Sequence, residues 1–200
     1  MGIFRRKLEA KDILFPLNKH LLSSIYELRE ITLDDSRRPK QSEDTIFSES
    51  AALVYLLVGS PVKLLKLPSS VEMFLLSVLK GVTCAFVTEL EKDEAQQFIE
   101  SRFDDYYGDL EGGFNEAEIC SKYLDFLGIV HGENDIIQNF SYTSFISGLF
   151  LFSMEILGAA KKNYKIIYSP ISKKDWASQQ EISLKISAQV QQASSEHEKK

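Results

Sequence analysis

The sequence predicts an all-α fold, an irregular bundle of about six or seven helices. Apolar residues recur at three- and four-residue spacing over most of the chain, which is the period of a helix. Glycine or proline stands at the ends of most of these segments, as expected for helix boundaries. Only residues 164–168 resemble a strand, and the sequence offers no evident partner strand.

Composition indicates one folded domain. Of the 200 residues, 44% are hydrophobic and 26% charged, which is ordinary for a globular protein. Thirteen Phe and eight Tyr supply large side chains for a core. We expect a single helical domain over residues 1–171, with roughly the first ten residues loose. Residues 172–200 are rich in Ser, Gln, Lys and Glu and predict a polar, flexible tail.

The first helix is expected over residues 17–31, with Pro16 in its first turn, where proline is tolerated. Its apolar stripe comprises Leu17, Leu21, Ile25 and Leu28. Residues 32–43 lack periodicity and predict an exposed loop. A second helix is expected over residues 48–58, because a glycine followed two residues later by Pro61 is typical of a helix end.

Two largely apolar segments are predicted to form the central helices of the bundle. The first covers residues 69–90, and Ser69 with Glu72 has the spacing of a capping box at its start. The second covers residues 135–162, with a break expected near residues 141–144. Its most apolar window is shorter than the about 20 residues that cross a bilayer, so a buried bundle helix is favoured.

Two amphipathic helices are expected between these central helices. One covers residues 93–107, burying Ala95, Ile99, Phe103 and Tyr106. The next begins at Asn115, whose side chain is placed to cap it, and ends at Gly128.

Motifs for catalysis, metal binding and phosphate binding are missing from the sequence. Cys84 and Cys120 lie in apolar helical segments and are expected to be buried thiols in a reducing, cytoplasmic compartment. His131 stands in a loop, but a Cys–His nucleophile pair would require an exposed Cys120. No pair of His and Glu has the spacing of a helical metal site. We therefore expect no catalytic residue, no metal site and no cofactor.

The densest cluster of charge lies between residues 91 and 118, a segment that contains ten acidic residues and two basic ones. Tyrosine beside clustered acids suits a basic protein partner, because the ring supplies contact area and the charges steer the encounter. The candidate binding residues are Asp104, Asp105, Tyr106, Tyr107, Asp109 and Glu111. The alternatives are a solvated helix face and a loose cation site, although the spacing does not fit an EF-hand loop.

The basic residues are concentrated near the N-terminus. Arg5, Arg6 and Lys7 follow Ile3 and Phe4, which would suit an anionic membrane surface. Membrane contact is therefore kept open but not favoured. The net charge of −6 argues against a general nucleic-acid binder.

The leading functional hypothesis is a non-enzymatic, intracellular interaction protein: an adaptor, a complex subunit or an antagonist of a basic partner. The alternative is an enzyme or small-ligand binder whose site is assembled from dispersed residues. Glu72, Lys80 and Glu155 motivate this alternative, since charges in apolar helices require partners if they are buried and converge. A membrane-peripheral helical protein is the second alternative.

Overall fold

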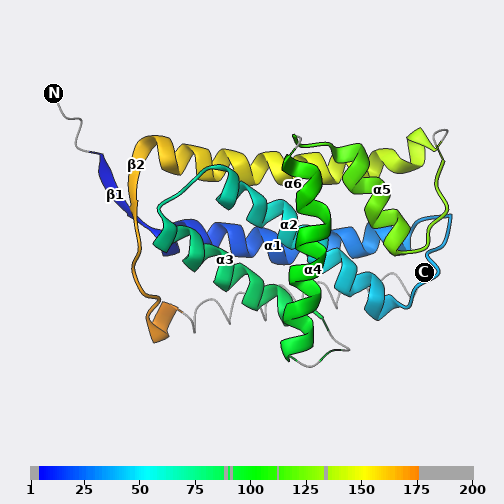
Figure 1. Cartoon of the computed structure of the whole chain (residues 1–200), viewed down its shortest axis with the longest axis horizontal. Helices are drawn as coiled ribbons and strands as arrows, with labels where there is room; N and C mark the ends of the chain where they lie inside the picture. The colour runs from blue at the N-terminus through cyan, green and yellow to red at the C-terminus, as the bar shows by residue number, and fades with distance from the viewer. Residues whose placement is uncertain (1–4, 88–89, 91, 112, 133–134, 176–200) are drawn as a thin grey trace, which may run out of the picture.

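A computed structural model of the chain describes residues 5–87, 90, 92–111, 113–132 and 135–175. It confirms the all-α fold, with six helices and one two-stranded parallel sheet in the described residues. The helices are α1 (Ala10–Leu33), α2 (Glu43–Leu64), α3 (Ser69–Cys84), α4 (Lys92–Glu111), α5 (Glu116–Phe126) and α6 (Ile136–Asn163). The strands are β1 (Arg6–Glu9) and β2 (Tyr164–Ile167). In Figure 1, α1 and α6 run along the length of the molecule and α4 crosses them.

Helix α2 is the centre of the bundle, in contact with α1, α3, α4, α5 and α6. It is buried almost continuously from Ser48 to Val62. By contrast, α3 buries one face only, made of Val71, Leu75, Leu79 and Thr83. The prediction that the third and last helices form the centre is therefore wrong. An apolar sequence does not by itself identify the central helix, because α2 carries buried serines whose hydroxyls bond within the helix, as Ser50 does to the carbonyl of Ile46 at 2.7 Å.

Helix α2 is also longer than predicted and continues through Gly59 and Pro61. It begins after Ser42, whose hydroxyl accepts a hydrogen bond of 3.2 Å from the Thr45 amide. Gly59 lies where α2 meets α3 and α4: a Cβ there would stand 3.4 Å from Leu76 Cδ2 and 3.6 Å from Phe103 Cε2. Gly59 therefore lies inside the helix, at a contact between helices, and does not end it.

The start of α1 differs from the prediction as well, since the helix begins at Ala10 and Pro16 lies inside it. Proline removes one intrahelical donor and leaves the carbonyl of Asp12 without its usual partner. Both residues are exposed, so water can satisfy that carbonyl.

Helix α3 begins without the predicted capping box. Pro68 occupies the cap position and no side chain caps the helix, whose first amide bonds run to the Pro68 carbonyl. The helix ends at Cys84, earlier than predicted.

The predictions for α4 and α5 are confirmed in their main features. The four residues expected to be buried in α4 are buried. Asn115 caps α5 by accepting a 3.3 Å hydrogen bond from the Glu118 amide. Gly128, with φ of 65°, follows the end of the helix.

Helix α6 is unbroken over its 28 residues, contrary to the expected interruption. Two segments, Glu43–Leu64 and Asn139–Asn163, are long and apolar enough to cross a membrane by length and composition. The first is 83% buried inside the bundle, as a core helix would be, whereas only 33% of the second is buried. Helix α6 is therefore peripheral, and its outward face exposes Phe140 and Leu151.

The two ends of the described chain meet in the sheet. Strand β2 lies where the sequence indicated a strand, and its partner β1 comes from the N-terminal residues expected to be loose. The parallel register runs from Arg6 opposite Tyr164 to Glu9 opposite Ile167. Pairing across about 160 residues leaves no local signal in the sequence, which is why the partner was missed.

The predicted tail begins with residues in contact with the domain. Ser172 and Asp175 cap each other reciprocally, and the Asp175 carboxylate lies 3.6 Å from Lys11 Nζ. Residues 176–200, the rest of the predicted tail, lie outside the described residues.

Candidate functional site

The predicted acidic patch is only partly on the surface. Asp104 and Asp105 are exposed on α4. Tyr106 is fully buried and its ring packs against Phe126, so it cannot anchor a partner, and this part of the prediction is wrong. The helical period explains the error, because Tyr106 belongs to the apolar stripe that the same sequence analysis assigned to the core. The side chains of Tyr107, Asp109 and Glu111 lie outside the described part of the structure.

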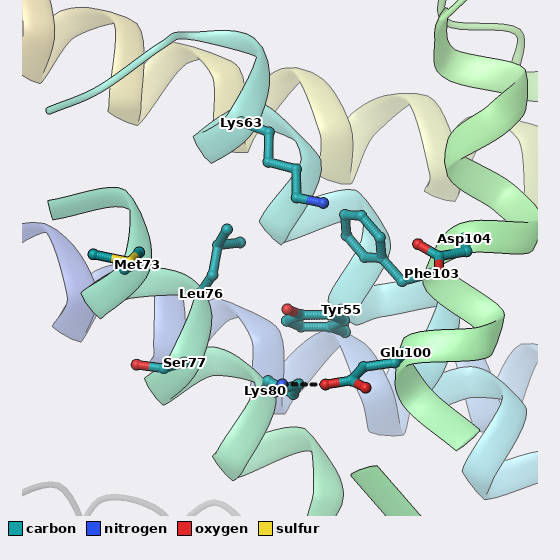
Figure 2. A pocket seen from close by; sticks show the side chains of 9 residues that line it. All are labelled: Tyr55, Lys63, Met73, Leu76, Ser77, Lys80, Glu100, Phe103 and Asp104. Atoms are coloured by element: carbon teal, nitrogen blue, oxygen red, sulfur yellow. Dashed lines mark hydrogen bonds and ion pairs between the residues drawn. The ribbon is translucent and has the colours of Figure 1, made fainter. Parts of the chain in front are cut away.

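Asp104 lines an open cleft between α3 and α4, with α2 at its base (Figure 2). We call it the α3–α4 cleft. Its volume is about 520 Å³, within the usual range for ligand sites. Three helices supply its lining: Tyr55 and Lys63 from α2, Met73, Leu76, Ser77 and Lys80 from α3, and Glu100, Phe103 and Asp104 from α4.

The base of the cleft is aromatic and apolar. The rings of Tyr55 and Phe103 pack with their centroids 5.4 Å apart, and Leu76 lies beside them. Burial raises the pKa of Tyr55 well above its ordinary value, so its hydroxyl stays neutral at physiological pH. The base therefore offers an apolar surface with one neutral hydroxyl group.

The rim of the cleft is charged and accessible. Lys80 Nζ lies 2.5 Å from Glu100 Oε1, and hydrogen bonds from Lys80 and Gln96 lower the pKa of Glu100. Lys63 Nζ stands 4.3 Å from the centre of the Phe103 ring, a cation–π distance. Met73 is 67% exposed and stands beside four charged residues of the rim.

A second hollow continues along the same two helices. It has a volume of about 610 Å³ and shares Ser77 and Lys80 with the α3–α4 cleft. Gln96 and the half-buried Cys84 also line it. The two hollows together follow α3 and α4 for several turns, so this surface can receive an extended or helical segment.

Glu72, Lys80 and Glu155, which were proposed to converge on a buried site, lie apart. Lys80 pairs with Glu100, whereas Glu72 is half-buried and Glu155 is exposed. Neither of these glutamates lines a described pocket with Lys80. A buried site built from these residues is therefore ruled out.

A buried ion pair that the sequence did not reveal holds α4 against α2. The Glu49 side chain is 3% exposed and accepts two hydrogen bonds from Arg102, from Nη2 at 2.7 Å and from Nε at 2.9 Å. The guanidinium carbon lies 3.8 Å from the centre of the Phe126 ring. Arg102 is thus oriented inward, while Asp104 on the same helix faces the cleft.

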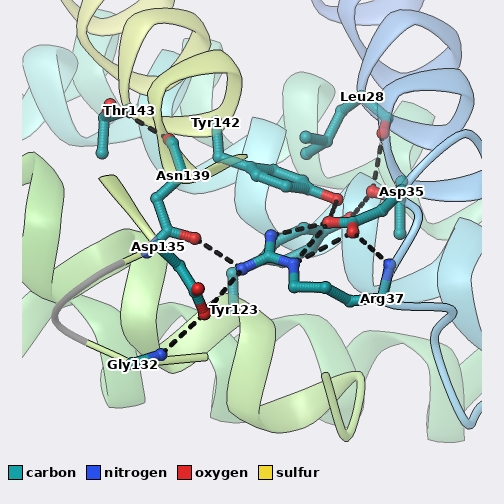
Figure 3. A network of polar contacts seen from close by, with 10 residues as sticks. Leu28, Asp35, Arg37, Tyr123, Gly132, Asp135, Asn139, Tyr142 and Thr143 are labelled. Carbon is teal, nitrogen blue, oxygen red and sulfur yellow. Dashed lines mark hydrogen bonds and ion pairs between the residues drawn. The ribbon is translucent and has the colours of Figure 1, made fainter. Parts of the chain in front are cut away.

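A second buried network fastens the loop between α1 and α2 to α6 (Figure 3). Asp35 accepts hydrogen bonds from Arg37 Nη2 at 2.6 Å and from the Tyr142 hydroxyl at 2.9 Å. Arg37 Nη1 in turn donates to Asn139 Oδ1 at 2.7 Å. Burial alone would raise the pKa of Asp35, but these hydrogen bonds outweigh it and hold the pKa below its usual range. The expectation of an exposed loop is wrong for Asp35 and Arg37, whose side chains are only 5% and 10% exposed.

Cys120 does not have the surroundings of an activated nucleophile. Burial raises the pKa of Cys120 to about 11, so its thiol stays protonated at neutral pH. His131 Nε2 lies 3.0 Å from Asp125 Oδ1 at the surface. Among the described residues, no group of three or more His, Cys, Asp or Glu side chains could hold a metal ion.

Comparisons of the chain with protein-family models, with curated proteins and with solved structures find no match. Functional inference therefore starts from the cleft itself.

Proposed function

We propose that the chain is a non-enzymatic interaction protein that binds a protein partner in the α3–α4 cleft. The observation that carries this proposal is the combination of an apolar base with an exposed Met73 and a charged rim. Contiguous apolar surface with a polar rim is typical of protein-interaction sites, and methionine adapts readily to different partners.

The chemistry of the cleft describes the partner segment. An apolar side chain would pack on Leu76 and Phe103, as an anchor does in a helix-in-groove complex. A basic side chain beside it would meet Asp104, which forms no ion pair within the described part of the chain. A basic, amphipathic helix or extended segment satisfies both requirements and agrees with the basic partner expected from the sequence.

A photo-crosslinking experiment tests this proposal. A benzophenone amino acid replaces Met73 at the cleft, and in a second protein it replaces Leu151, which is 62% exposed on α6. We expect a discrete protein adduct in a cell extract from position 73, and we expect Asp104→Lys to reduce it. An adduct that forms equally at position 151, or that is insensitive to Asp104→Lys, would contradict the proposal.

A small-molecule ligand is the second candidate, favoured by the volume of about 520 Å³. The open mouth of the cleft and its exposed methionine fit a protein segment better. Native mass spectrometry of the purified chain distinguishes the two, because a retained small molecule that Leu76→Trp expels would favour a ligand-binding protein.

A further inference from the structure

A second charged surface lies at the end of the molecule where β1 and β2 meet, far from α4 in Figure 1. We call it the basic end. It contains seven basic residues: Arg5, Arg6, Lys7, Lys66, Lys161, Lys162 and Lys165. Hydrogen bonds connect the three parts of the chain that carry these residues: Arg5 Nη1 donates to the Lys161 carbonyl, and Lys161 Nζ donates to the Leu65 carbonyl.

Lys7 and Lys165 face each other across the two strands. Their neighbours Leu8 and Ile166 pack on the core, so the alternation of a strand directs both lysines outward. Both are exposed, and neither forms an ion pair or a side-chain hydrogen bond with any residue in the described part of the chain. Like charges at facing positions repel each other. The pair therefore concentrates positive charge on the exposed face of the sheet.

Two acids near the basic end in the described part of the chain are already paired with Lys11. Glu9 is the closest in sequence, and its carboxylate binds Lys11 at 3.0 Å and the Ser169 hydroxyl at 3.1 Å. Asp175 also lies against Lys11. Positive charge therefore accumulates here in a chain whose net charge is −6.

Exposed aromatic and aliphatic side chains accompany these lysines. Tyr168 is 51% exposed, Leu64 40% and Tyr164 36%. Tyrosine favours the headgroup region of a bilayer, and lysine can keep its charge at the lipid phosphates while its stem covers apolar surface. Nucleic acid fits less well, because stacking on bases requires a free aromatic ring and Tyr168 already packs against Phe74, with ring centroids 5.4 Å apart.

From these observations we infer that the basic end docks on an anionic phospholipid surface, with Lys7, Lys165 and their basic neighbours contacting headgroups and Leu64, Tyr164 and Tyr168 entering the interface. None of these residues lines either hollow along α3 and α4, so the inference does not rest on the proposed function.

Vesicle sedimentation with the full chain tests the inference. The probes are phosphatidylcholine vesicles with and without roughly 30% phosphatidylserine. We expect binding only to the anionic vesicles, and weaker binding as salt increases. Replacing both Lys7 and Lys165 by Gln should weaken binding by on the order of 30-fold, since each basic side chain near such a surface contributes appreciably.

Two further variants make the test specific. Arg38→Gln with Lys40→Gln removes the same charge from the exposed loop at the opposite end of the molecule and should bind like the parent chain. Lys7→Arg with Lys165→Arg keeps the charge and should also retain binding. The inference is overturned if the parent chain does not bind anionic vesicles. It is also overturned if the Lys7/Lys165 double variant and the Arg38/Lys40 double variant bind these vesicles equally well. Tighter binding to a fluorescent single-stranded oligonucleotide at the same salt would also overturn it, by assigning the surface to nucleic acid.

Discussion

Helix α4 forms ion pairs with two neighbouring helices, α2 and α3, and the surroundings of these two pairs are opposite. Arg102 reaches inward to Glu49, which is 3% exposed, whereas Glu100 reaches outward to Lys80 at the rim of the cleft. The inner pair is closed by two hydrogen bonds and an aromatic ring, and the outer pair remains accessible to solvent. The comparison shows that charge density along a helix does not define a binding surface: the inner pair stabilises the fold, and only the outer charges are available to a partner.

Breaking the inner pair, Glu49 with Arg102, should cause the largest loss of stability. Arg102→Met leaves the Glu49 carboxylate buried without its partner and should lower the free energy of unfolding by about 3 kcal/mol. Lys80→Met at the outer pair should cost less than about 1 kcal/mol, because that pair is exposed to water. Urea unfolding measures both changes in the free energy of unfolding. Equal losses would contradict the conclusion that the inner pair stabilises the fold more than the outer pair does.

A companion variant separates pairing from packing. Glu49→Met together with Arg102→Met removes both charges, and it should recover much of the stability lost by Arg102→Met alone. A double variant as unstable as the single one would mean that the contacts of Arg102 with the aromatic rings matter more than its charge.

The Asp35 network predicts a specific loss of stability in acid. The folded-state pKa of Asp35 is lowered, so its contribution to stability is present above its unfolded pKa of about 4 and is lost as the pH falls through the lower folded-state value. Asp35→Asn should cost about 2 kcal/mol at neutral pH. It should also flatten the fall in melting temperature below about pH 4. A variant whose acid profile parallels the parent chain would rule out this role for Asp35.

Two glycines offer a smaller test of the packing around the central helix. Gly59→Ala should stabilise the chain by about 0.5–1 kcal/mol, because a methyl group there meets Leu76 at an ordinary contact distance and alanine favours the helix. Gly128→Ala should destabilise it by about 1–2 kcal/mol, since φ is 65° and a Cβ would stand 3.3 Å from Lys40 Cβ. Thermal melts of the two variants should therefore shift in opposite directions, and a shared sign would contradict this description of the two sites.

The sequence predicted the helical class, the buried face of α4 and the cap of α5, because periodicity and caps are local signals. It misplaced the helix ends at Gly59 and Pro16, where tertiary packing and solvent exposure allow a helix to continue past a residue that often ends one. It also missed the partner of β2, the burial of Asp35 and the Glu49–Arg102 pair. Each of these depends on residues far apart in the chain, and a single sequence carries no signal for such contacts.

Among the residues that line the α3–α4 cleft, the sequence indicated Asp104 as a binding residue and Lys80 as part of the alternative site. It did not indicate Met73, Lys63 or Phe103, because they come from three helices that only the fold brings together. The only usable signal was Met73, which stands beside the apolar stripe of its helix rather than in it.

The most direct measurement of the central claim is the association rate of the partner recovered at position 73, followed at several salt concentrations. Asp104→Asn is compared with Glu155→Gln, which removes the same charge from an exposed position on α6. Both variants should change the free energy of unfolding by less than about 0.5 kcal/mol. We predict slower association and a weaker salt dependence for Asp104→Asn only. Identical association by the two variants would contradict the assignment of the α3–α4 cleft as the binding site.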